Sequence, residues 1–188
     1  NIMKKINNIA IVGFGSIGRR HFRLIRKTFP AVNLVLVRFQ RKEIYPEEKF
    51  ADAIFSNINE VINFGIDAAI IASPASIHIN HAVQFVKAGI PILIEKPLSN
   101  NLEDAILFNQ IASEKNVKVL LGYVLRHSIT SQIFKNNIEN DKLGDKLFAH
   151  INCSSYLPDW RVNQDYRKTV SASAKLGGGV LLELSHEI

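Results

Sequence analysis

Sulfur is scarce in this sequence, which has one cysteine, Cys153, and one methionine, Met3, among 188 residues. A single cysteine excludes an internal disulfide, and this usage suits a reducing compartment, so we expect a cytoplasmic protein. Long apolar runs are absent as well: no stretch approaches the ~18 residues that span a bilayer, and we expect no membrane association. Cys153 has no base or basic residue beside it, which predicts a small, buried and unreactive side chain.

Acidic residues are fewer than basic ones: the sequence has 17 Asp and Glu and 23 Lys and Arg, which gives a net charge of +6. An apolar share of 47% and a charged share of 21% still describe an ordered globular protein. The positive charge is densest in a cluster behind a glycine-rich turn, at Arg19, Arg20, Arg23, Arg26 and Lys27. This cluster indicates either a small anionic ligand or a solvated helix face. No stripe of alternating basic and aromatic residues, of the kind that stacks on bases, is present, so we expect no nucleic-acid partner.

Six short apolar runs alternate with helix-like patterns over the first two thirds of the chain, at residues 6–12, 34–38, 53–55, 68–71, 92–94 and 117–121. This alternation predicts an α/β protein with a Rossmann-type doubly wound parallel sheet over residues 1–125. Residues 126–188 then read as the beginning of a second, incomplete α+β domain, with a helix at 128–140 and a longer strand at 146–156.

The two ends of the chain suggest a truncated protein. Met3 precedes a Lys-Lys-Ile sequence and looks like the native start, while Ile188 falls inside an apolar pattern. We therefore expect the strand at 146–156 to lack partners, and the chain by itself to have poor activity.

A capping-box-like pair, Asn100 with Glu103, is expected to start the helix that precedes the sixth strand.

The clearest motif is Gly13-Phe14-Gly15-Ser16-Ile17-Gly18, which follows the first predicted strand and opens a helix. The first glycine permits a tight turn, the second lets the backbone approach a pyrophosphate, and the third allows close packing of helix on strand. The N–H groups at the start of the helix favour an anion. The motif predicts dinucleotide binding; the alternative is a Rossmann-like turn that has no ligand.

The residue that usually holds the adenine ribose lies ~20 positions further on, at the end of the second strand. No Asp or Glu occurs there, whereas Arg38 and Arg41 do. A carboxylate would bind the 2′-hydroxyl of NAD(H), and arginines would attract the 2′-phosphate of NADP(H). The sequence therefore favours NADP(H), with NAD(H) as second choice; the alternative is a solvated basic loop.

A second motif, Glu95-Lys96-Pro97, follows the fifth predicted strand at the edge where doubly wound sheets bind ligands. A partly desolvated lysine there is suited to proton transfer, although a Lys-Pro pair alone is more often a plain turn. With the other motifs, the chain resembles the Gfo/Idh/MocA oxidoreductases, relatives of glucose–fructose oxidoreductase and inositol dehydrogenase. The matching pieces are Gly13–His21, Ser73-Pro74 with His78, Glu95–Ser99, Gly122-Tyr123 with Arg126, and Gly177–Gly179 before Glu183 and His186.

The resemblance implies an NAD(P)-dependent oxidoreductase that transfers hydride between nicotinamide and a sugar, cyclitol or nucleotide-sugar hydroxyl or ketone. It implies that Lys96 and His186 are catalytic and bind substrate, and that Glu183 stands where the family has an aspartate. That acid is a glutamate here, three residues before the histidine instead of the commoner four. The cofactor-binding residues that it implies beyond the glycine turn are Ser73, Pro74, His78, Glu95, Lys96 and Arg126.

A late segment mixes aromatic residues with arginines, at Tyr156, Trp160, Arg161, Tyr166 and Arg167. Aromatic faces stack on sugars and arginines bind anions, so we expect these residues to contact substrate, or else to form an ordinary interface. The family resemblance also implies that residues 126–188 begin a substrate and oligomerisation domain, and that the full-length protein is a homo-oligomer. His78 and His81 have a spacing that suits metal ligands, but no third ligand is indicated, and we expect no metal. A non-catalytic dinucleotide-binding or regulatory Rossmann module is the alternative function.

Overall fold

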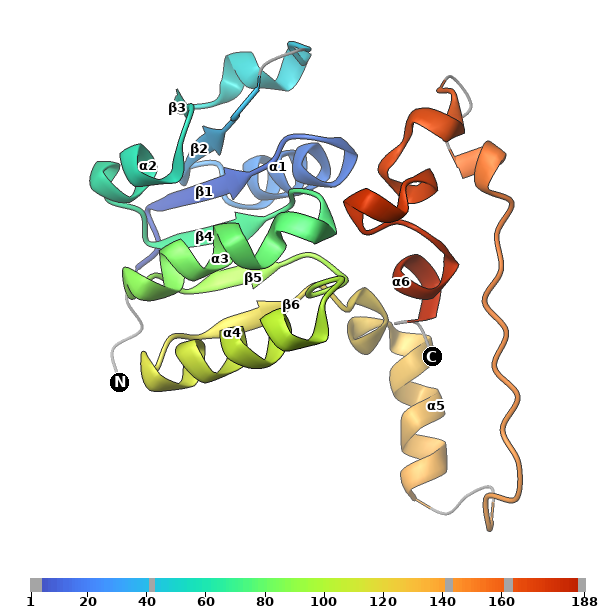
Figure 1. Cartoon of the computed structure of the whole chain (residues 1–188). Helices are drawn as coiled ribbons and strands as arrows, with labels where there is room; N and C mark the ends of the chain where they lie inside the picture. Colours follow the sequence, from blue (N-terminus) through green and yellow to red (C-terminus); the bar gives the residue numbers. More distant parts are fainter. Residues whose placement is uncertain (1–4, 41–42, 141–143, 161–163, 186–188) are drawn as a thin grey trace. The chain divides into compact units, whose positions relative to one another are not determined.

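The computed structural model describes residues 5–40, 43–140, 144–160 and 164–185. The chain divides into two compact units, residues 1–121 and residues 122–188, called unit 1 and unit 2 below. Unit 1 contains every strand found in the described part of the chain, and unit 2 is built from helices and irregular segments (Figure 1).

Unit 1 is organised around a six-stranded, all-parallel sheet in the order β3-β2-β1-β4-β5-β6. The strands are β1 (Asn8–Val12), β2 (Asn33–Val37), β3 (Ala53–Phe55), β4 (Ala68–Ile71), β5 (Ile92–Ile94) and β6 (Val119–Leu121). The order reverses between β1 and β4, and this is the point where open α/β sheets bind ligands beyond the carboxyl ends of their strands. The Rossmann-type fold expected from the alternating pattern is confirmed.

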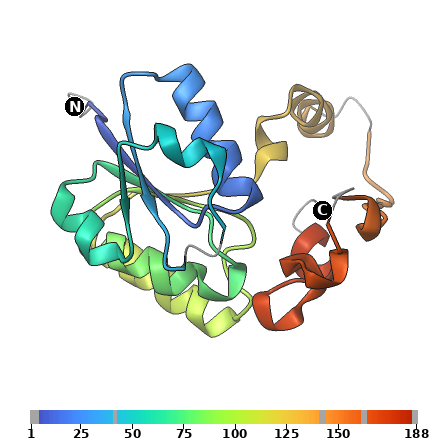
Figure 2. The ribbon, with the colours of Figure 1, turned by 90° about the horizontal axis from the view of Figure 1, so that it is seen from above.

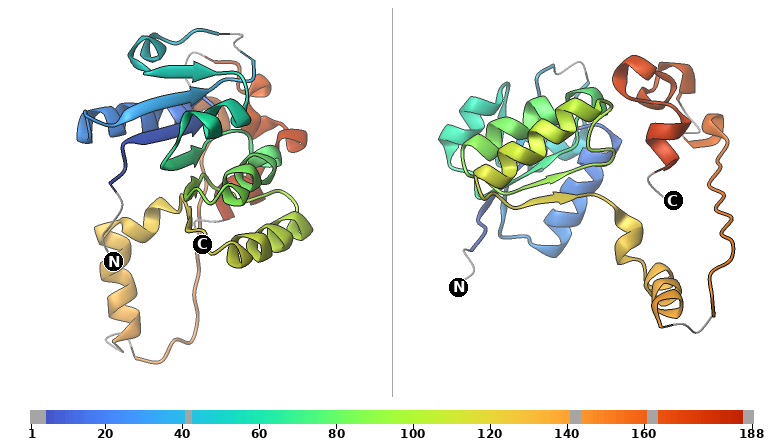
Figure 3. Two further views of the ribbon diagram at one scale, coloured as in Figure 1. Left: turned by 90° about the vertical axis from the view of Figure 1, so that its left-hand side faces the viewer. Right: turned by 60° about the horizontal axis from the view of Figure 1, so that its bottom comes forward.

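Helices cover both faces of this sheet. They are α1 (Ser16–Thr28), α2 (Ile58–Phe64), α3 (His78–Lys87) and α4 (Leu102–Glu114), with a 3₁₀ helix η1 (Pro46–Phe50) between β2 and β3. Helices α2, α3 and α4 lie on one face and α1 lies on the other, as the view from above and the tilted view show (Figures 2 and 3). The central strands of a parallel sheet covered in this way are buried on both faces, which explains why they read as nearly continuous apolar runs.

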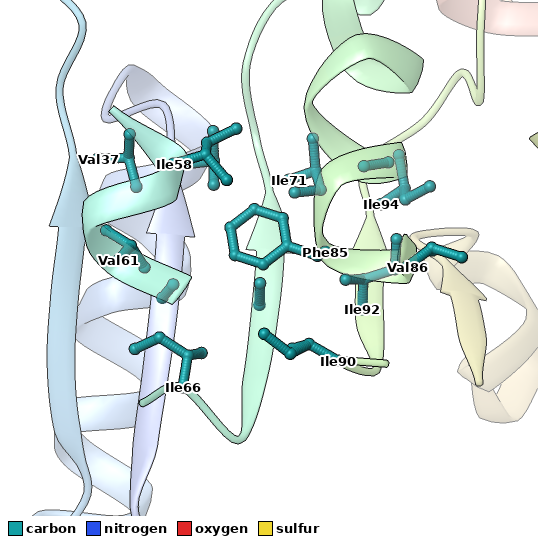
Figure 4. Close-up of a cluster of buried hydrophobic side chains, with 14 of the residues drawn as sticks. Val37, Ile58, Val61, Ile66, Ile71, Phe85, Val86, Ile90, Ile92 and Ile94 are labelled. Carbon is teal, nitrogen blue, oxygen red and sulfur yellow. The ribbon is translucent and has the colours of Figure 1, made fainter. Parts of the chain in front are cut away.

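The core follows the two-residue period of the strands. In β1, Ala10 and Val12 pack toward α2, α3 and α4, whereas Ile11 packs toward α1. The larger cluster contains Phe85 of α3, which is fully buried among branched side chains from the sheet and from α2 (Figure 4). The smaller cluster contains Phe22 of α1 and Phe14 of the glycine-rich turn. Packing of Phe14 in the smaller cluster therefore fixes the turn after β1 relative to the sheet.

One helix start differs from the sequence prediction. The side chain of Asn101, not that of Asn100, caps α4 by accepting a hydrogen bond at 2.9 Å from the amide of Asp104. Asn100 and Glu103 therefore do not form the expected capping box. Two adjacent asparagines satisfy the capping preference equally well, so the sequence does not distinguish them.

Unit 2 differs more from expectation. It contains α5 (Ile129–Glu139), α6 (Val180–Leu184) and several 3₁₀ turns, and residues 144–156 form no strand. Leu147 and Phe148 in this stretch are 93% and 87% exposed. The expected strand at 146–156 is thus absent, because no described segment pairs with it and a strand needs a neighbour to satisfy its backbone. The prediction of a buried Cys153 is wrong for the same reason: its side chain lies in this uncovered stretch and is exposed.

None of the helices in the described part of the chain is long and apolar enough to cross a membrane.

Candidate functional site

The glycine-rich turn joins β1 to α1 at the carboxyl edge of the sheet. Gly13 has a φ of +88°, and a Cβ there would lie 2.7 Å from the carbonyl oxygen of Ala72. A Cβ on Gly18 would lie 2.1 Å from the carbonyl oxygen of Gly13, so the helix approaches the turn too closely for any side chain. Gly15 differs from both, because a Cβ would meet nothing within 4 Å. Gly13 and Gly18 are therefore required by packing, while the space at Gly15 is open to a ligand.

The amino end of α1 is built to receive an anion. Gly15 is its N-cap, no described side chain caps it, and no acidic residue stands in its first turn. Its first amides thus have no side-chain acceptor in the described part of the chain, and the helix dipole adds positive potential there. Of the three other predicted ligand contacts in this turn, Ser16 is exposed to a ligand. Phe14 is buried against Phe22, and Ile17 is partly buried against the same cluster. The residues present fit the diphosphate of a dinucleotide.

Arg38, expected to bind a 2′-phosphate, is already engaged. It follows β2, and its Nη1 donates to the carboxylate of Glu48 while its Nη2 donates to the carbonyl oxygen of Glu43 at 2.9 Å. Its guanidinium also lies 5.7 Å from the ring centre of Phe14 and 5.3 Å from that of Tyr45. Only 8% of the Arg38 side chain is exposed. Arg41, the other arginine of this prediction, lies outside the described residues.

Residues 43–50, called the acidic segment below, also neutralise part of the basic cluster on α1. Glu47 accepts hydrogen bonds from Arg19 at 2.9 and 3.1 Å and from Arg23 at 3.1 Å. The hydrogen bonds from Arg19 hold the pKa of Glu47 below its usual value. Arg26 pairs with Asp52 just beyond the segment. Much of the cluster that could have met an anionic ligand is therefore paired within unit 1.

The loop after β4 contains Ser73 and Pro74 and is connected to the loop after β5 by His78. His78 is 1% exposed, and its Nε2 and Nδ1 lie 2.6 Å and 2.8 Å from the carbonyl oxygens of Ser73 and Pro97. Burial lowers the pKa of His78, against the opposing effects of both carbonyls and of Glu95. The ring therefore lies between the loop expected to contact the cofactor and the loop that carries Lys96, and in its neutral form it donates to one of the two carbonyls.

His81, one turn along α3, is also buried and hydrogen-bonds the Ser73 hydroxyl at 2.9 Å through Nδ1. The ring of Phe39 stacks on it with centroids 4.6 Å apart. Burial, with a smaller contribution from His78, lowers the pKa of His81 to about 4. The ring is therefore neutral at pH 7.

Glu95 and Lys96 lie at the carboxyl end of β5. The Glu95 carboxylate is hydrogen-bonded to Nε2 of His21 at 2.6 Å and accepts a hydrogen bond from the Lys96 amide at 3.3 Å. Lys96 is partly exposed and is followed by a cis peptide bond to Pro97. The sequence analysis gave His21 no site role beyond its place at the end of the Gly13–His21 match, yet its side chain connects α1 directly to the residue before Lys96. The sequence offered one signal for this role: His21 lies three residues after Gly18, so the two share the helix face that packs on the sheet.

The remaining predicted site residues belong to unit 2. Arg126 is exposed and lies over the ring of Tyr123, Arg167 pairs with Asp165, and Glu183 accepts from the Ser171 hydroxyl at 3.3 Å. Trp160 and Tyr166 line a cavity of about 10 Å³, which is the size of a water molecule and far too small for a sugar. Tyr156 is 71% exposed and stands outside that lining. Arg161 and His186 lie outside the described residues, so the predicted Glu183–His186 pair stays a prediction.

Metal ligands do not gather in the part of the chain that the structure describes, where no three His, Cys, Asp or Glu side chains form a group that could hold an ion. Both ring nitrogens of His78 face carbonyl oxygens, so the expected spacing of His78 and His81 does not bring two free nitrogens together.

The strand order and the glycine turn define a dinucleotide-binding Rossmann domain. Residues 7–123 match the Gfo/Idh/MocA family, described as an oxidoreductase family with an NAD-binding Rossmann fold. The chain belongs to this family.

Two curated relatives are sugar or cyclitol dehydrogenases. Glucose-6-phosphate 3-dehydrogenase of Bacillus subtilis is 30% identical over 183 residues, which cover 93% of this chain and 51% of the relative. Inositol 2-dehydrogenase of Acidiphilium cryptum is 29% identical over 152 residues, which cover 76% of this chain and 44% of the relative. The chain thus spans about half the length of these relatives.

Solved structures show the same fold. The WlbA dehydrogenase of Bordetella pertussis, in complex with NADH and UDP-GlcNAcA, superposes with a TM-score of 0.69 at 24% identity, covering 77% of this chain and 42% of that one. The scyllo-inositol dehydrogenase of Lactobacillus casei, with bound NAD(H) and scyllo-inositol, gives a TM-score of 0.66 at 23% identity, covering 75% and 43%.

Proposed function

We propose that this chain forms the cofactor-binding part of an NAD(P)-dependent dehydrogenase or reductase that acts on CH–OH groups. The observation that carries the proposal is the placement of Lys96 on the same sheet edge as the open glycine turn, with α1 connected to Glu95 through His21. Membership of an oxidoreductase family supports it.

The cofactor's diphosphate would lie over Gly15 and the exposed amino end of α1. Ser73, Pro74 and His78, in and after the loop that follows β4, are proposed as further cofactor-binding residues. NADP(H) is the first choice from the sequence and NAD(H) the second, because Arg38 and Arg41 replace the usual acid after β2. The pairing of Arg38 with Glu48 weakens this choice, and the solved relatives named above contain NAD(H). Arg126 is proposed as a further cofactor contact from unit 2.

The cofactor would supply the hydride acceptor or donor at the nicotinamide. The chain's own residues then handle the proton of the reacting hydroxyl group. His186 is the proposed base in oxidation, and the acid in reduction, since a histidine titrates near neutral pH. Lys96 would polarise the hydroxyl oxygen or relay its proton, and Glu183 would orient the histidine.

We propose a sugar, a cyclitol or a nucleotide sugar as substrate. The named activities of the curated relatives support this class. Tyr156, Trp160, Arg161, Tyr166 and Arg167 are the proposed contacts to it. The proposal also includes a cytoplasmic location and a homo-oligomer formed by the full-length protein, with unit 2 as the beginning of the domain that binds substrate.

Turnover measurements test the catalytic assignment. Because this chain spans about half the length of its relatives, turnover is measured on the full-length protein. Full-length wild type, Lys96→Ala and His186→Ala are assayed with a panel of sugars, cyclitols and nucleotide sugars, and NADH affinity is measured in parallel. We expect each variant to lose about 100-fold or more in turnover, the usual contribution of a general acid or base, with cofactor affinity kept. Full activity in both variants contradicts the assignment. Tight cofactor binding with no turnover by wild type favours the non-catalytic regulatory module instead.

A further inference from the structure

The acidic segment places one buried carboxylate directly on Arg38. Glu48, in η1, is 5% exposed, and its Oε1 accepts both from Nη1 of Arg38 and, at 3.0 Å, from the amide of Tyr45. Its side chain is even less exposed, at 3%, than the arginine it holds. Glu48 therefore neutralises Arg38 inside the protein and does not present its carboxylate to solvent.

This pair stands where a dinucleotide would extend its adenine ribose. The Arg38 guanidinium lies beside Phe14, the residue between the first two glycines of the turn, and the amide of Gly13 donates to the carbonyl oxygen of Val37, the residue before Arg38. The ring of Tyr45 covers Arg38 from the acidic segment. A 2′-phosphate that approached this arginine would find Nη1 engaged by Glu48 and Nη2 by the Glu43 carbonyl, and it would be repelled by the Glu48 carboxylate.

We propose that Glu48 is a specificity-determining residue that withholds Arg38 from a 2′-phosphate and so shifts the site from NADP(H) toward NAD(H). The proposal rests on the dinucleotide binding proposed above. Glu48 acts through Arg38 and does not itself contact the cofactor. The preference that an arginine after β2 gives on its own is thus cancelled by a residue ten positions later in the sequence.

The ratio of NADPH to NADH affinity tests this role, measured by nicotinamide fluorescence at matched ionic strength. Glu48→Gln keeps the size of the side chain and removes its charge. The buried Arg38 guanidinium is then left without its anionic partner and can bind the 2′-phosphate. We expect NADPH to bind about tenfold more tightly, the usual value of a charge-assisted contact, with NADH affinity unchanged. In the double variant Arg38→Gln/Glu48→Gln the gain should vanish.

Glu47→Gln is the matched control. It removes the same charge from the neighbouring position, but Glu47 pairs with Arg19 and Arg23 on α1 and not with Arg38. Its NADPH to NADH ratio should stay within about threefold of wild type, because no pair at the ribose position changes.

Three outcomes overturn the role of Glu48. One is an unchanged ratio in folded Glu48→Gln, and another is an equal gain in Glu47→Gln. The third is a tenfold loss of NADPH affinity in Arg38→Gln alone, which would show that Arg38 already meets the phosphate. If Glu48→Gln does not fold, Glu48→Asp withdraws the carboxylate by one methylene and should give a smaller gain in the same direction. Failure of every variant and of wild type to bind either nucleotide contradicts the dinucleotide proposal itself.

Discussion

The Nε2 atom of His21 lies 2.6 Å from Oε1 of Glu95, so the helix that follows the glycine turn is hydrogen-bonded to the residue before Lys96. Both side chains are largely buried, at 19% and 9% exposed. A buried carboxylate needs such a partner, because losing its hydrogen bonds without regaining water is costly. This one contact therefore connects the proposed cofactor turn with the proposed catalytic turn.

Replacing His21 should destabilise unit 1. His21→Leu removes the donor and leaves the Glu95 carboxylate poorly satisfied, so we expect urea unfolding to show a loss of about 2 kcal/mol. His21→Gln can still donate a hydrogen bond and should lose less than half of that. Equal stability of His21→Leu and wild type would show that the contact contributes nothing.

Substitutions at two glycines of the turn should affect different properties, Gly15→Ala cofactor binding and Gly18→Ala folding stability. Gly15→Ala enters open space at an ordinary φ of −74°, so we expect a stability change within about 1 kcal/mol. NADH affinity should fall about tenfold or more, because the new methyl group occupies the space meant for the pyrophosphate.

Gly18→Ala is the matched comparison. Its Cβ would overlap the Gly13 carbonyl, which is backbone and cannot move aside, so we expect a loss of about 3 kcal/mol. Urea unfolding measures both variants. A stable Gly18→Ala, or a Gly15→Ala that keeps full NADH affinity, would contradict these separate roles.

Stability should fall in mild acid because of His81. Its folded pKa of about 4 lies below the ordinary 6.5, so the unfolded chain takes up a proton at a higher pH than the folded chain does. The stabilisation is present above pH 6.5 and is lost progressively down to pH 4, by about 3 kcal/mol at most. Denaturant unfolding from pH 7 to 4 should give a flatter profile for His81→Gln than for wild type.

If His81→Gln follows the wild-type profile, the His81 ring does not titrate as its burial requires.

Capping of α4 gives a further prediction. Asn101→Ala removes the acceptor of the Asp104 amide and should lower stability by about 1 kcal/mol. Asn100→Ala changes an exposed neighbour and should stay within about 0.3 kcal/mol of wild type. A larger loss of stability for Asn100→Ala than for Asn101→Ala in thermal unfolding would show that Asn100 is the cap.

The sequence predicted most of unit 1, because the core there depends on local patterns. Nearly continuous apolar runs indicated strands buried on both faces, and Gly13 and Gly18 marked a turn whose backbone conformation and close packing only glycine permits. Alternation of strands with helices then left a parallel, doubly wound sheet as the natural arrangement.

Long-range pairing could not be predicted in the same way. Whether Arg38 is free depends on where Glu48 returns after ten residues of irregular chain, and no local pattern reports this. The apolar alternation at 146–156 likewise indicates a strand only when a partner strand is available. The exposed Cys153 follows from that missing partner.

The central claim is that the turn at Gly13–Gly18 binds a nicotinamide dinucleotide. Titration of the purified chain with NADH and with NADPH, followed by nicotinamide fluorescence at matched ionic strength, tests it most directly. Saturable binding of at least one of them, weakened about tenfold or more by Gly15→Ala, is the predicted result. Failure of the folded chain to bind either nucleotide would contradict the account.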